Sequence, residues 1–401
     1  ELTQTSGLWN TTTGFLPVGD AITPFSGQFD GLGHTISNLA IYRPMIDNVG
    51  LFGKIHSAGI VRNLGLDGGS VTGKGHSGGL AGYNAGIVAD VYNTGTVAGN
   101  DWYTGGLIGE NAGSVQRSYA TGVVTGTSGV GGLIGLNQTP GSVSQTYATG
   151  SVTGAGSSGG YDVGGLVGEN RSPIEDSYAT GAVSGAADRV GGLTGFNVSS
   201  ITRAYAAGAV SSIGPNTGGL VGGNSSGTIS NSYWDKTINP SLTGNVLGTP
   251  LTTSEFMDPT KLTGLGFSGS DGNSSAVWWM IQGETRPFLR SEYSTNIANA
   301  HQLQLMALNL DASYSLANNI DMSELTKASG LWKKWDIATP DTGFVPVGED
   351  AYRFTGTFDG LGRTISGLYI NRPYHVGLFG YTSSAAIIRN VGLVNGNIIG
   401  N

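Results

Sequence analysis

The sequence predicts an all-β protein built as a parallel β-helix, with a small mixed connector that contains short helices. The first observation behind this prediction is a short internal repeat whose copies follow one another at spacings of 27, 26, 33, 27 and 27 residues. The second is that apolar residues recur within each copy in short stretches bounded by Gly, Asn or Ser. Such stretches have the length of strands, and they bury apolar surface only when successive copies stack.

Each short unit begins with Gly-Gly-Leu, at residues 78, 105, 131, 164, 191 and 218. Four apolar positions then recur, and we expect each to form a column through the stack. The columns consist of Leu (Leu80, Leu107, Leu133, Leu166, Leu193, Leu220), a branched residue (Val88, Val115, Val143, Ile174, Ile201, Ile229), Tyr (Tyr92, Tyr119, Tyr147, Tyr178, Tyr205, Tyr233) and Val (Val97, Val124, Val152, Val183, Val210). A unit of this length fits one coil with about three short strands, and neighbouring coils would lie about 4.8 Å apart.

Asparagine occupies the seventh position of every short unit: Asn84, Asn111, Asn137, Asn170, Asn197 and Asn224. A polar binding surface is one interpretation of this column. The favoured interpretation is a structural ladder at a turn, in which each side chain hydrogen-bonds to its neighbours.

A longer repeat shows how the chain is organised. Residues 24–39 return as residues 353–368, and Arg62-Asn-Leu-Gly-Leu returns as Arg389-Asn-Val-Gly-Leu, so the parent is expected to be a tandem array. We predict four parts: opening coils of the β-helix (1–73), six repeat units (74–237), a connector between stacks (238–323) and the start of the next long repeat (324–401). Within the connector, residues 252–262 and 298–310 have helix-compatible spacing, and Trp278, Trp279 and Phe288 are expected to form its core.

Composition excludes several classes of function. The chain has no cysteine, so disulfides and thiolate metal sites are excluded. Its net charge of −8 argues against nucleic-acid binding. No run of about 18 apolar residues is present, so membrane insertion as a helix is not expected. The sequence does not open on a signal peptide, and we expect it to be a segment of a longer protein.

No arrangement of residues predicts catalysis, and we expect neither a metal nor a cofactor. The histidines differ between the two long copies: Arg363 replaces His34, and Ser383 replaces His56. Asp30 and Asp359 precede glycine, which is the usual signature of a turn. Glu110 and Glu169 occupy the same repeat position in units that lie two apart. A cooperating pair of catalytic carboxylates at this position is therefore an alternative that their spacing allows.

The segment before each Gly-Gly-Leu varies in length and content, and this variation suits binding. Solenoids place insertions on one face, which is often the binding face. Trp102, Tyr103, Tyr161 and Asp162 are expected to line one such edge. Exposed aromatic rings beside carboxyl groups suit stacking on sugars. The alternative is that Trp102 and Tyr161 only cover the corner of the next coil.

The units of the form Gly-Gly-Leu-x-Gly-x-Asn…Ser-Tyr-Ala-Thr-Gly resemble the GLUG motif of bacterial surface proteins. Together with Ser232-Tyr-Trp-Asp235 and residues 297–323, they are similar to repeat regions of filamentous-haemagglutinin-like exoproteins of two-partner secretion systems. The resemblance implies a right-handed β-helical fibre, export of the parent through an outer-membrane secretion pore, and roles in adhesion or biofilm.

The sequence thus predicts a non-enzymatic, structural and adhesive segment of a large secreted bacterial surface protein. Its expected partners are host-cell or matrix glycans or protein receptors. The alternatives are a polysaccharide lyase or hydrolase on a β-helix, and an ice- or surface-binding solenoid built on Thr94, Thr121, Thr149 and Thr180.

Overall fold

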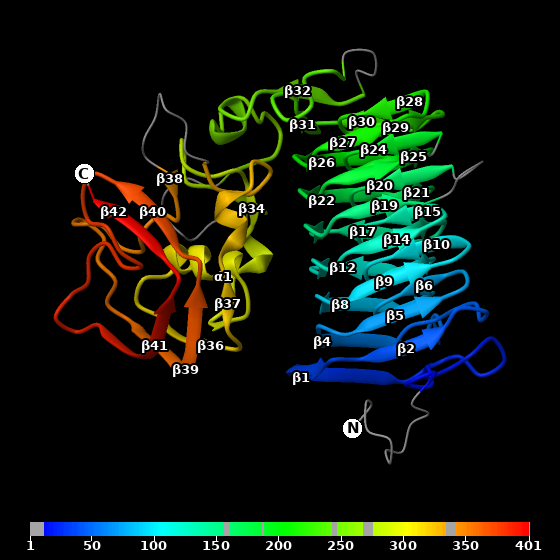
Figure 1. Cartoon of the computed structure of the whole chain (residues 1–401), viewed down its shortest axis with the longest axis horizontal. Coiled ribbons are helices and arrows are strands. Elements are labelled where there is room, and N and C mark those ends of the chain that lie inside the picture. Colours follow the sequence, from blue (N-terminus) through cyan, green and yellow to red (C-terminus); the bar gives the residue numbers. More distant parts are fainter. Residues whose placement is uncertain are drawn as a thin grey trace. The chain divides into compact units, whose positions relative to one another are not determined.

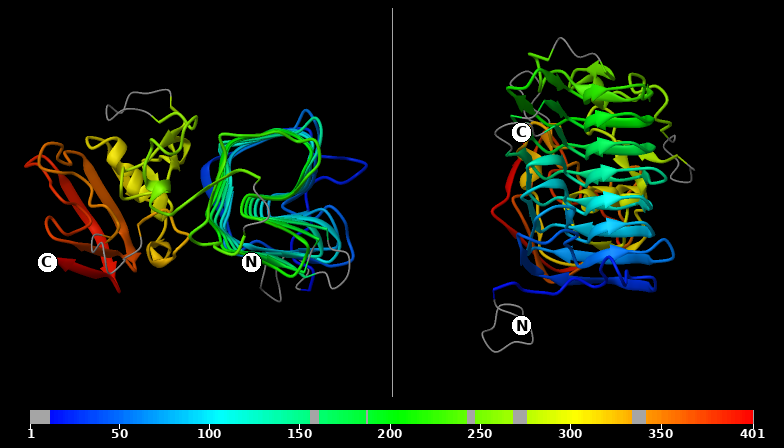
Figure 2. Two further views of the ribbon diagram at one scale, coloured as in Figure 1. Left: turned by 90° about the horizontal axis from the view of Figure 1, so that it is seen from above. Right: turned by 90° about the vertical axis from the view of Figure 1, so that its right-hand side faces the viewer.

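The computed structural model describes residues 12–155, 161–186, 188–242, 247–267, 276–333 and 342–400. The chain divides into two compact units, Glu1–Thr253 and Ser254–Asn401. The first unit is a parallel β-solenoid, in which successive coils superimpose when viewed along the stack (Figures 1 and 2). The prediction of an all-β solenoid with a few short helices is therefore confirmed.

Four parallel sheets form the walls of the first unit, one more than the three or so strands expected for each coil. We name the sheets by their position in the repeat. The corner sheet contains β6 (Ser77–Gly78), β10 (Trp102–Gly105), β15 (Ser128–Gly131), β20 (Asp162–Gly164), β24 (Arg189–Gly191) and β28 (Asn216–Gly218). The asparagine sheet contains β3 (Phe52–Ile55), β7 (Ala81–Asn84), β11 (Ile108–Asn111), β16 (Ile134–Asn137), β21 (Val167–Asn170), β25 (Thr194–Asn197) and β29 (Val221–Asn224).

The other two walls follow in each coil. The tyrosine sheet contains β1 (Gln28–Ser37), β4 (Ile60–Asp67), β8 (Ile87–Asn93), β12 (Ser114–Gln116), β13 (Tyr119–Ala120), β17 (Ser142–Ser144), β18 (Tyr147–Ala148), β22 (Ile174–Ala179), β26 (Ile201–Ala206), β30 (Ile229–Ser230), β31 (Tyr233–Asp235) and β32 (Thr249–Leu251). The valine sheet contains β2 (Ala40–Arg43), β5 (Ser70–Gly73), β9 (Thr96–Gly99), β14 (Val124–Gly126), β19 (Val152–Gly154), β23 (Val183–Gly185) and β27 (Val210–Ser212).

The core of the first unit consists of stacked columns of identical or similar residues. All six leucines of the Gly-Gly-Leu motifs are 0% exposed, and the branched column from Val88 to Ile201 is at most 1% exposed. A second, smaller core of valines lies between the valine sheet and the corner sheet. The tyrosines of neighbouring coils stack face to face, with ring centroids 4.5–5.0 Å apart and ring planes within 8° of parallel. Exact repetition of residue type keeps every coil in register, because each side chain packs on a copy of itself.

The six asparagines form a continuous hydrogen-bonded ladder. The Nδ2 of each one donates to the Oδ1 of the asparagine in the next coil, over 2.8–2.9 Å, from Asn84 to Asn224. Asn84, Asn111, Asn197 and Asn224 also bond to their own turns; the backbone N–H of Gly86, for example, donates to Asn84 Oδ1. The first five of these asparagines are fully buried, at 0% exposure. The ladder therefore satisfies a line of amide groups that water does not reach.

A glycine two residues before each of these asparagines allows two walls to approach closely. A Cβ placed on Gly135 would lie 2.7 Å from the backbone nitrogen of Thr104 in the corner sheet. The same close approach occurs at Gly109, Gly168, Gly195 and Gly222. These glycines are thus required by backbone contact, and their φ angles are not in the left-handed region.

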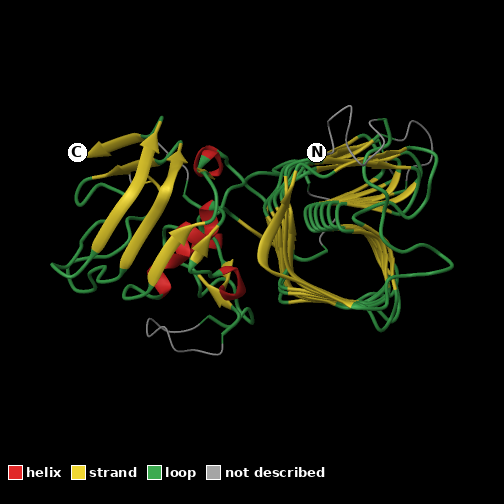
Figure 3. Ribbon diagram, turned by 90° about the horizontal axis from the view of Figure 1, so that it is seen from below, coloured by secondary structure: helices red, strands yellow, loops and turns green. Residues whose placement is uncertain are grey.

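The second unit begins with short elements that pack around a helix. These elements are η1 (Glu255–Met257), β33 (Trp278–Trp279), β34 (Phe288–Leu289), η2 (Arg290–Glu292), α1 (Ala300–Leu305), η3 (Met306–Leu308) and η4 (Ser323–Thr326). Figure 3 draws the helical segments of the chain in red. Asn299 caps α1, because its side chain accepts a hydrogen bond from the backbone N–H of Gln302. Trp278 and Phe288 are fully buried.

The rest of the second unit is again a stack of parallel strands. One sheet contains β35 (Asn296–Ile297), β36 (Ser313–Leu316), β37 (Ile320–Asp321), β39 (Thr357–Ser366) and β41 (Ile387–Val394). The other contains β38 (Thr342–Gly343), β40 (Tyr369–Arg372) and β42 (Asn397–Gly400), with β38 antiparallel to β40. Strands between residues 296 and 321, which the sequence places in the connector, thus already belong to this stack.

Candidate functional site

Trp102 and Tyr161 lie together on the surface of the first unit. Trp102 opens β10, and Tyr161 directly precedes β20, two coils further along the stack. The small residue Ser128 occupies the coil between them, and its Oγ accepts a hydrogen bond from the backbone N–H of Tyr161. The two rings are nearly parallel, with centroids 6.1 Å apart, and the residues are 44% and 42% exposed. They form an exposed aromatic pair, while residues 156–160 of the same corner lie outside the described residues.

Tyr103 and Asp162, which the sequence places on the same edge, turn inward instead. The Tyr103 hydroxyl donates to Glu169 Oε2 over 3.4 Å, and burial, with the Glu169 charge, raises the pKa of Tyr103 to about 12. Asp162 is only 3% exposed, and its carboxylate lies 2.6 Å from Nε of Arg189. Burial raises the pKa of Asp162 to about 7, although Arg189 opposes the shift. The prediction of Asp162 as a surface contact is therefore corrected: the strand turns this side chain toward Arg189 and away from solvent.

The inward side chains belong to a feature that sequence reasoning missed, which we name the seam. One side of the seam is a column on the corner sheet, and the other side is a column on the asparagine sheet. The corner column is His76, Tyr103, Gly129, Asp162 and Arg189, and the facing column is Tyr83, Glu110, Leu136, Glu169 and Phe196. His76 Nε2 lies 2.9 Å from Glu110 Oε2, and the Arg189 guanidinium lies 3.8 Å from the centre of the Phe196 ring. The signal in the sequence was that two repeat positions carry polar or aromatic side chains in several units: the position two residues before Gly-Gly-Leu and the sixth position of the unit. Each position varies from unit to unit, so neither one alone indicates a site.

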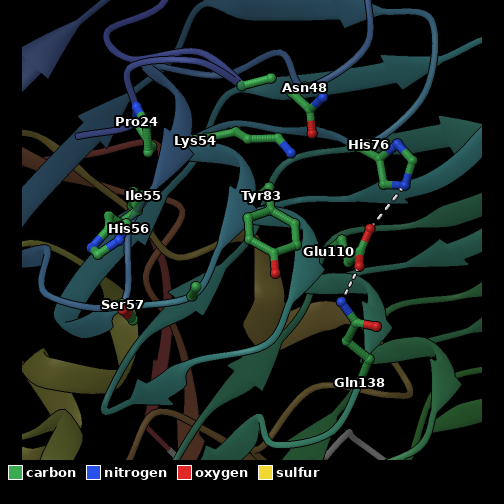
Figure 4. Close-up of a pocket in the computed structure, with 12 residues that line it drawn as sticks. Pro24, Asn48, Lys54, Ile55, His56, Ser57, His76, Tyr83, Glu110 and Gln138 are labelled. Atoms are coloured by element: carbon green, nitrogen blue, oxygen red, sulfur yellow. Dashed lines mark hydrogen bonds and ion pairs between the residues drawn. The ribbon is translucent and has the colours of Figure 1, made fainter. Parts of the chain in front are cut away.

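At one end of the seam, a cavity of about 630 Å³ opens beside Glu110. Figure 4 shows Glu110 between His76 and Gln138, with hydrogen bonds or ion pairs to both. The Lys54 ammonium group lies 4.7 Å from the centre of the Tyr83 ring on the same wall. This cavity offers both hydrogen-bond donors and acceptors, and an aromatic face, to a polar ligand.

The two seam glutamates have separate partners. Glu110 and Glu169 lie in one column, with the buried Leu136 between them, so their strands are about 10 Å apart. Glu110 is bonded to His76 and Gln138, whereas Glu169 is bonded to Tyr103 and Arg171. No partner is shared between these two sets. Across the described ranges, no group of three or more His, Asp or Glu side chains is placed to hold a metal ion.

The threonines of the ice-binding alternative do not form an open array. Thr180 is 4% exposed, and Thr94, Thr121 and Thr149 are half-buried. The Thr94 hydroxyl donates to Asp67 Oδ1 over 3.0 Å. This column therefore contributes to the packing of the coils rather than to a flat surface.

The second unit contains a buried charged cluster around His301. Nδ1 of His301 lies 2.6 Å from Glu292, and Nε2 lies 3.0 Å from Glu324. Burial works to lower the pKa of His301, but the carboxylates of Glu324 and Glu292 raise it to about 10. The His301 charge lowers the pKa of Glu324, against the opposing effect of burial. The cluster is thus an imidazolium held between two carboxylates inside the unit.

We expect the stability of the second unit to depend on pH through this cluster. Because the folded pKa of His301 lies above its unfolded value, the stabilisation is complete below about pH 6.5 and declines as the pH rises toward 10. Because the pKa of Glu324 is lowered, its contribution is complete above about pH 4.5 and declines as the pH falls from there through the folded pKa. Replacing His301→Gln should lower the free energy of unfolding by about 3 kcal/mol at pH 6.5, since two buried carboxylates lose their charge partner.

The measurement is urea unfolding followed by tryptophan fluorescence at pH 6.5, 8.5 and 10. It is informative because Trp278 and Trp332 are buried in this unit, and Trp332 lies beside His301. His375→Gln, at an exposed position of the same unit, is the matched control and should leave the pH dependence intact. An equal slope with pH in wild type and His301→Gln would contradict the assignment.

Comparison with known proteins gives two partial similarities. The chain is 46% identical over 81 residues to halomucin of Haloquadratum walsbyi, covering 20% of this chain and 1% of halomucin. It is 39% identical over 77 residues to a putative Gly-rich membrane protein of Evansella cellulosilytica, covering 18% of this chain and 9% of that protein. The chain thus matches only a small part of each relative's length.

No family model matches the chain, and no solved structure matches it. Among the described residues, none of the helices has the length and apolar character needed to cross a membrane. The second relative, by contrast, is named as a membrane protein.

Proposed function

We propose that this chain is a structural and adhesive segment of a large secreted bacterial surface protein, with a contact for host-cell or matrix glycans on the first unit. The observation that carries the proposal is the unbroken stack of coils, in which core columns, tyrosine stacks and the asparagine ladder all run through successive repeats. Such a stack transmits force along its length and spaces repeated weak sites at fixed intervals, so attachment gains strength through avidity.

The comparisons support a long parent protein. The segment similar to this chain is only 1% of halomucin and 9% of the Evansella protein, so comparable sequence occurs within much longer chains. Export of the parent by a two-partner secretion pore remains part of the proposal, and it rests on the resemblance of the repeat units to GLUG-type exoprotein repeats.

The exposed pair formed by Trp102 and Tyr161 is the proposed glycan contact. Aromatic faces at a solvent-exposed edge bind the apolar faces of sugar rings, and each aromatic contact contributes on the order of 1 kcal/mol. The Arg189 guanidinium lies 6.0 Å from the centre of the Tyr161 ring, on the seam side. Tyr103 contributes to the fold instead. Its ring packs directly on Gly129 of the next coil, where a Cβ atom would lie only 2.4 Å from the ring.

The test is a broad glycan array probed with the 401-residue chain and with the double variant Trp102→Ala/Tyr161→Ala. We expect the wild type to bind defined glycans and the double variant to bind them at least tenfold more weakly, because both stacking faces are removed. Tyr42→Ala is the matched control, since Tyr42 is 57% exposed on β2, which belongs to the valine sheet and not to the corner sheet. Equal binding by wild type and a correctly folded double variant would rule out this contact.

The same array separates adhesion from enzymatic cleavage of a polysaccharide. The observation that favours the enzyme alternative is His76 beside Glu110 in the cavity of about 630 Å³. Loss of immobilised sugar with the wild type, but not with Glu110→Gln, would replace the adhesive proposal by a lyase or hydrolase.

A further inference from the structure

The chain contains the same coil twice, in two different surroundings. In the first copy β1 pairs with β4, and in the second copy β39 pairs with β41, in the same parallel register. Phe29 lies opposite Val61 and Phe358 lies opposite Ile388; both pairings are followed by an irregularity after the aspartate, Asp30 or Asp359. The two coils are therefore matched position by position.

The second copy is covered on its other edge by residues of the preceding connector. Strands β36 and β37 pair with β39, so that Tyr314 lies opposite Phe358 and Ile320 lies opposite Ile365. The Tyr314 ring also packs near Phe354, with centroids 6.3 Å apart. As a result, Phe354, Phe358 and Ile365 are all 0% exposed.

In the first copy the matching edge is open. Strand β1 is the terminal strand of its sheet among the described residues. The residues that correspond to the buried set, Phe25, Phe29 and Ile36, are half-buried. Val18 is 40% exposed, whereas its counterpart Val347 is 0% exposed. Residue type and register are the same, so the two copies differ in that no described segment of the chain covers β1 as residues 293–323 cover β39.

The opposite end of the coil provides an internal check. In the first copy β8 covers β4, and β9 covers β5, so Val61 and Leu66 are at most 1% exposed. The counterparts Ile388 and Leu393, on the terminal strand β41, are 42% and 49% exposed. The chain thus shows which sequence packs on each face of this coil. Connector strands β36 and β37 pack on one face in the second copy, and repeat strands β8 and β9 pack on the other face in the first copy.

We propose that the open edge of β1 is a docking site for a connector segment with the sequence of residues 293–323, supplied by another copy of the long repeat. The segment would add β36 and β37 to the tyrosine sheet by strand addition, with Tyr314 opposite Phe29 and Ile320 opposite Ile36. The Asn319 side chain, which accepts a hydrogen bond from the backbone N–H of Thr364, would accept one from Thr35. This contact gives the fibre a direction, because connectors cover one face of the coil and short repeat units cover the other. It is independent of the glycan contact.

The experiment adds a fluorescent synthetic peptide of residues 293–323 to the 401-residue chain. We expect saturable binding by anisotropy, and at least tenfold slower amide hydrogen exchange over residues 28–37. The doubly substituted peptide Tyr314→Asp/Ile320→Asp should bind at least tenfold more weakly, because both apolar contacts become charged. This comparison leaves the protein itself unchanged.

Two protein variants provide the matched pair. Ile36→Glu should weaken peptide binding at least tenfold, since Ile36 corresponds to the covered Ile365. Leu32→Glu should bind as the wild type does, since Leu32 is 75% exposed and its counterpart Leu361 remains 56% exposed in the covered copy. If Ile36→Glu does not fold, the substituted peptide decides alone. Absence of protection at millimolar peptide, protection confined to residues 357–366, or equal binding by the two peptides would overturn the proposal.

Discussion

Replacing Asn137→Asp should destabilise the first unit by about 3–5 kcal/mol at pH 7, since it places an uncompensated charge in the buried ladder. Asn137 is 0% exposed; its Nδ2 donates to Asn170 Oδ1, and its Oδ1 accepts from Asn111 Nδ2. An aspartate keeps the second bond but has no donor for the first, so two oxygens face each other. Asn137→Ala should cost about 2–4 kcal/mol, because Asn111 Nδ2 and Asn170 Oδ1 each lose the hydrogen bond that Asn137 supplies inside the stack.

The effect of Asn137→Asp should also depend on pH. Burial beside an acceptor raises the pKa of the new carboxyl group above its unfolded value, so the variant regains stability as the pH falls through the folded pKa. The protonated carboxyl then donates to Asn170, as the amide does in the wild type. Urea unfolding followed by circular dichroism at pH 4.5 and pH 7 measures this change.

Asn224→Asp is the matched control for the ladder. Asn224 is half-buried, accepts from Asn197 Nδ2, and donates to the carbonyl of Gly227 rather than to another asparagine. The substitution should therefore cost clearly less than at Asn137. Equal losses at the two positions, or no dependence on pH at Asn137, would mean that the ladder does not stabilise the stack in the way described.

The fold was predictable because the repeat places identical residues at the same position of each short unit. A column such as Leu107, Leu133 and Leu166 indicates directly how neighbouring coils align. The coils must stack because no single coil has a core of its own. The fourth wall was not predictable in the same way. Residues 102–105 and 162–164 share few side chains, and they form strands because the backbone of the neighbouring coil offers pairing partners.

The candidate site was likewise predictable in part. The sequence indicated Trp102 and Tyr161 as exposed aromatics, and the structure places them side by side at the surface. It also indicated Asp162 as a surface residue, but the direction of a side chain at the start of a short strand depends on the pleat and on its neighbour Arg189. The seam was missed because each of its two columns varies along the repeat, and only their facing arrangement pairs His76 with Glu110.

Replacing Gly168→Ala should destabilise the first unit by about 3 kcal/mol or more, because the added methyl group has no space. A Cβ on Gly168 would lie 2.5 Å from the carbonyl carbon of Gly129 and 2.7 Å from the backbone nitrogen of Val130. These are backbone atoms of paired strands, so relief requires that the asparagine sheet and the corner sheet separate. Separation would also disturb the seam, where Tyr103 and Glu169 bridge the same two walls.

Thermal unfolding of the 401-residue chain followed by circular dichroism measures this effect, as a lower midpoint for the first unit. Gly27→Ala is the control, because a Cβ on Gly27 would meet only the Phe25 ring at an ordinary contact distance of 3.4 Å. Its midpoint should stay close to that of the wild type. If Gly168→Ala matched the control, the two walls would have enough freedom to separate, and close backbone contact could no longer explain why glycine recurs at this position in every short unit.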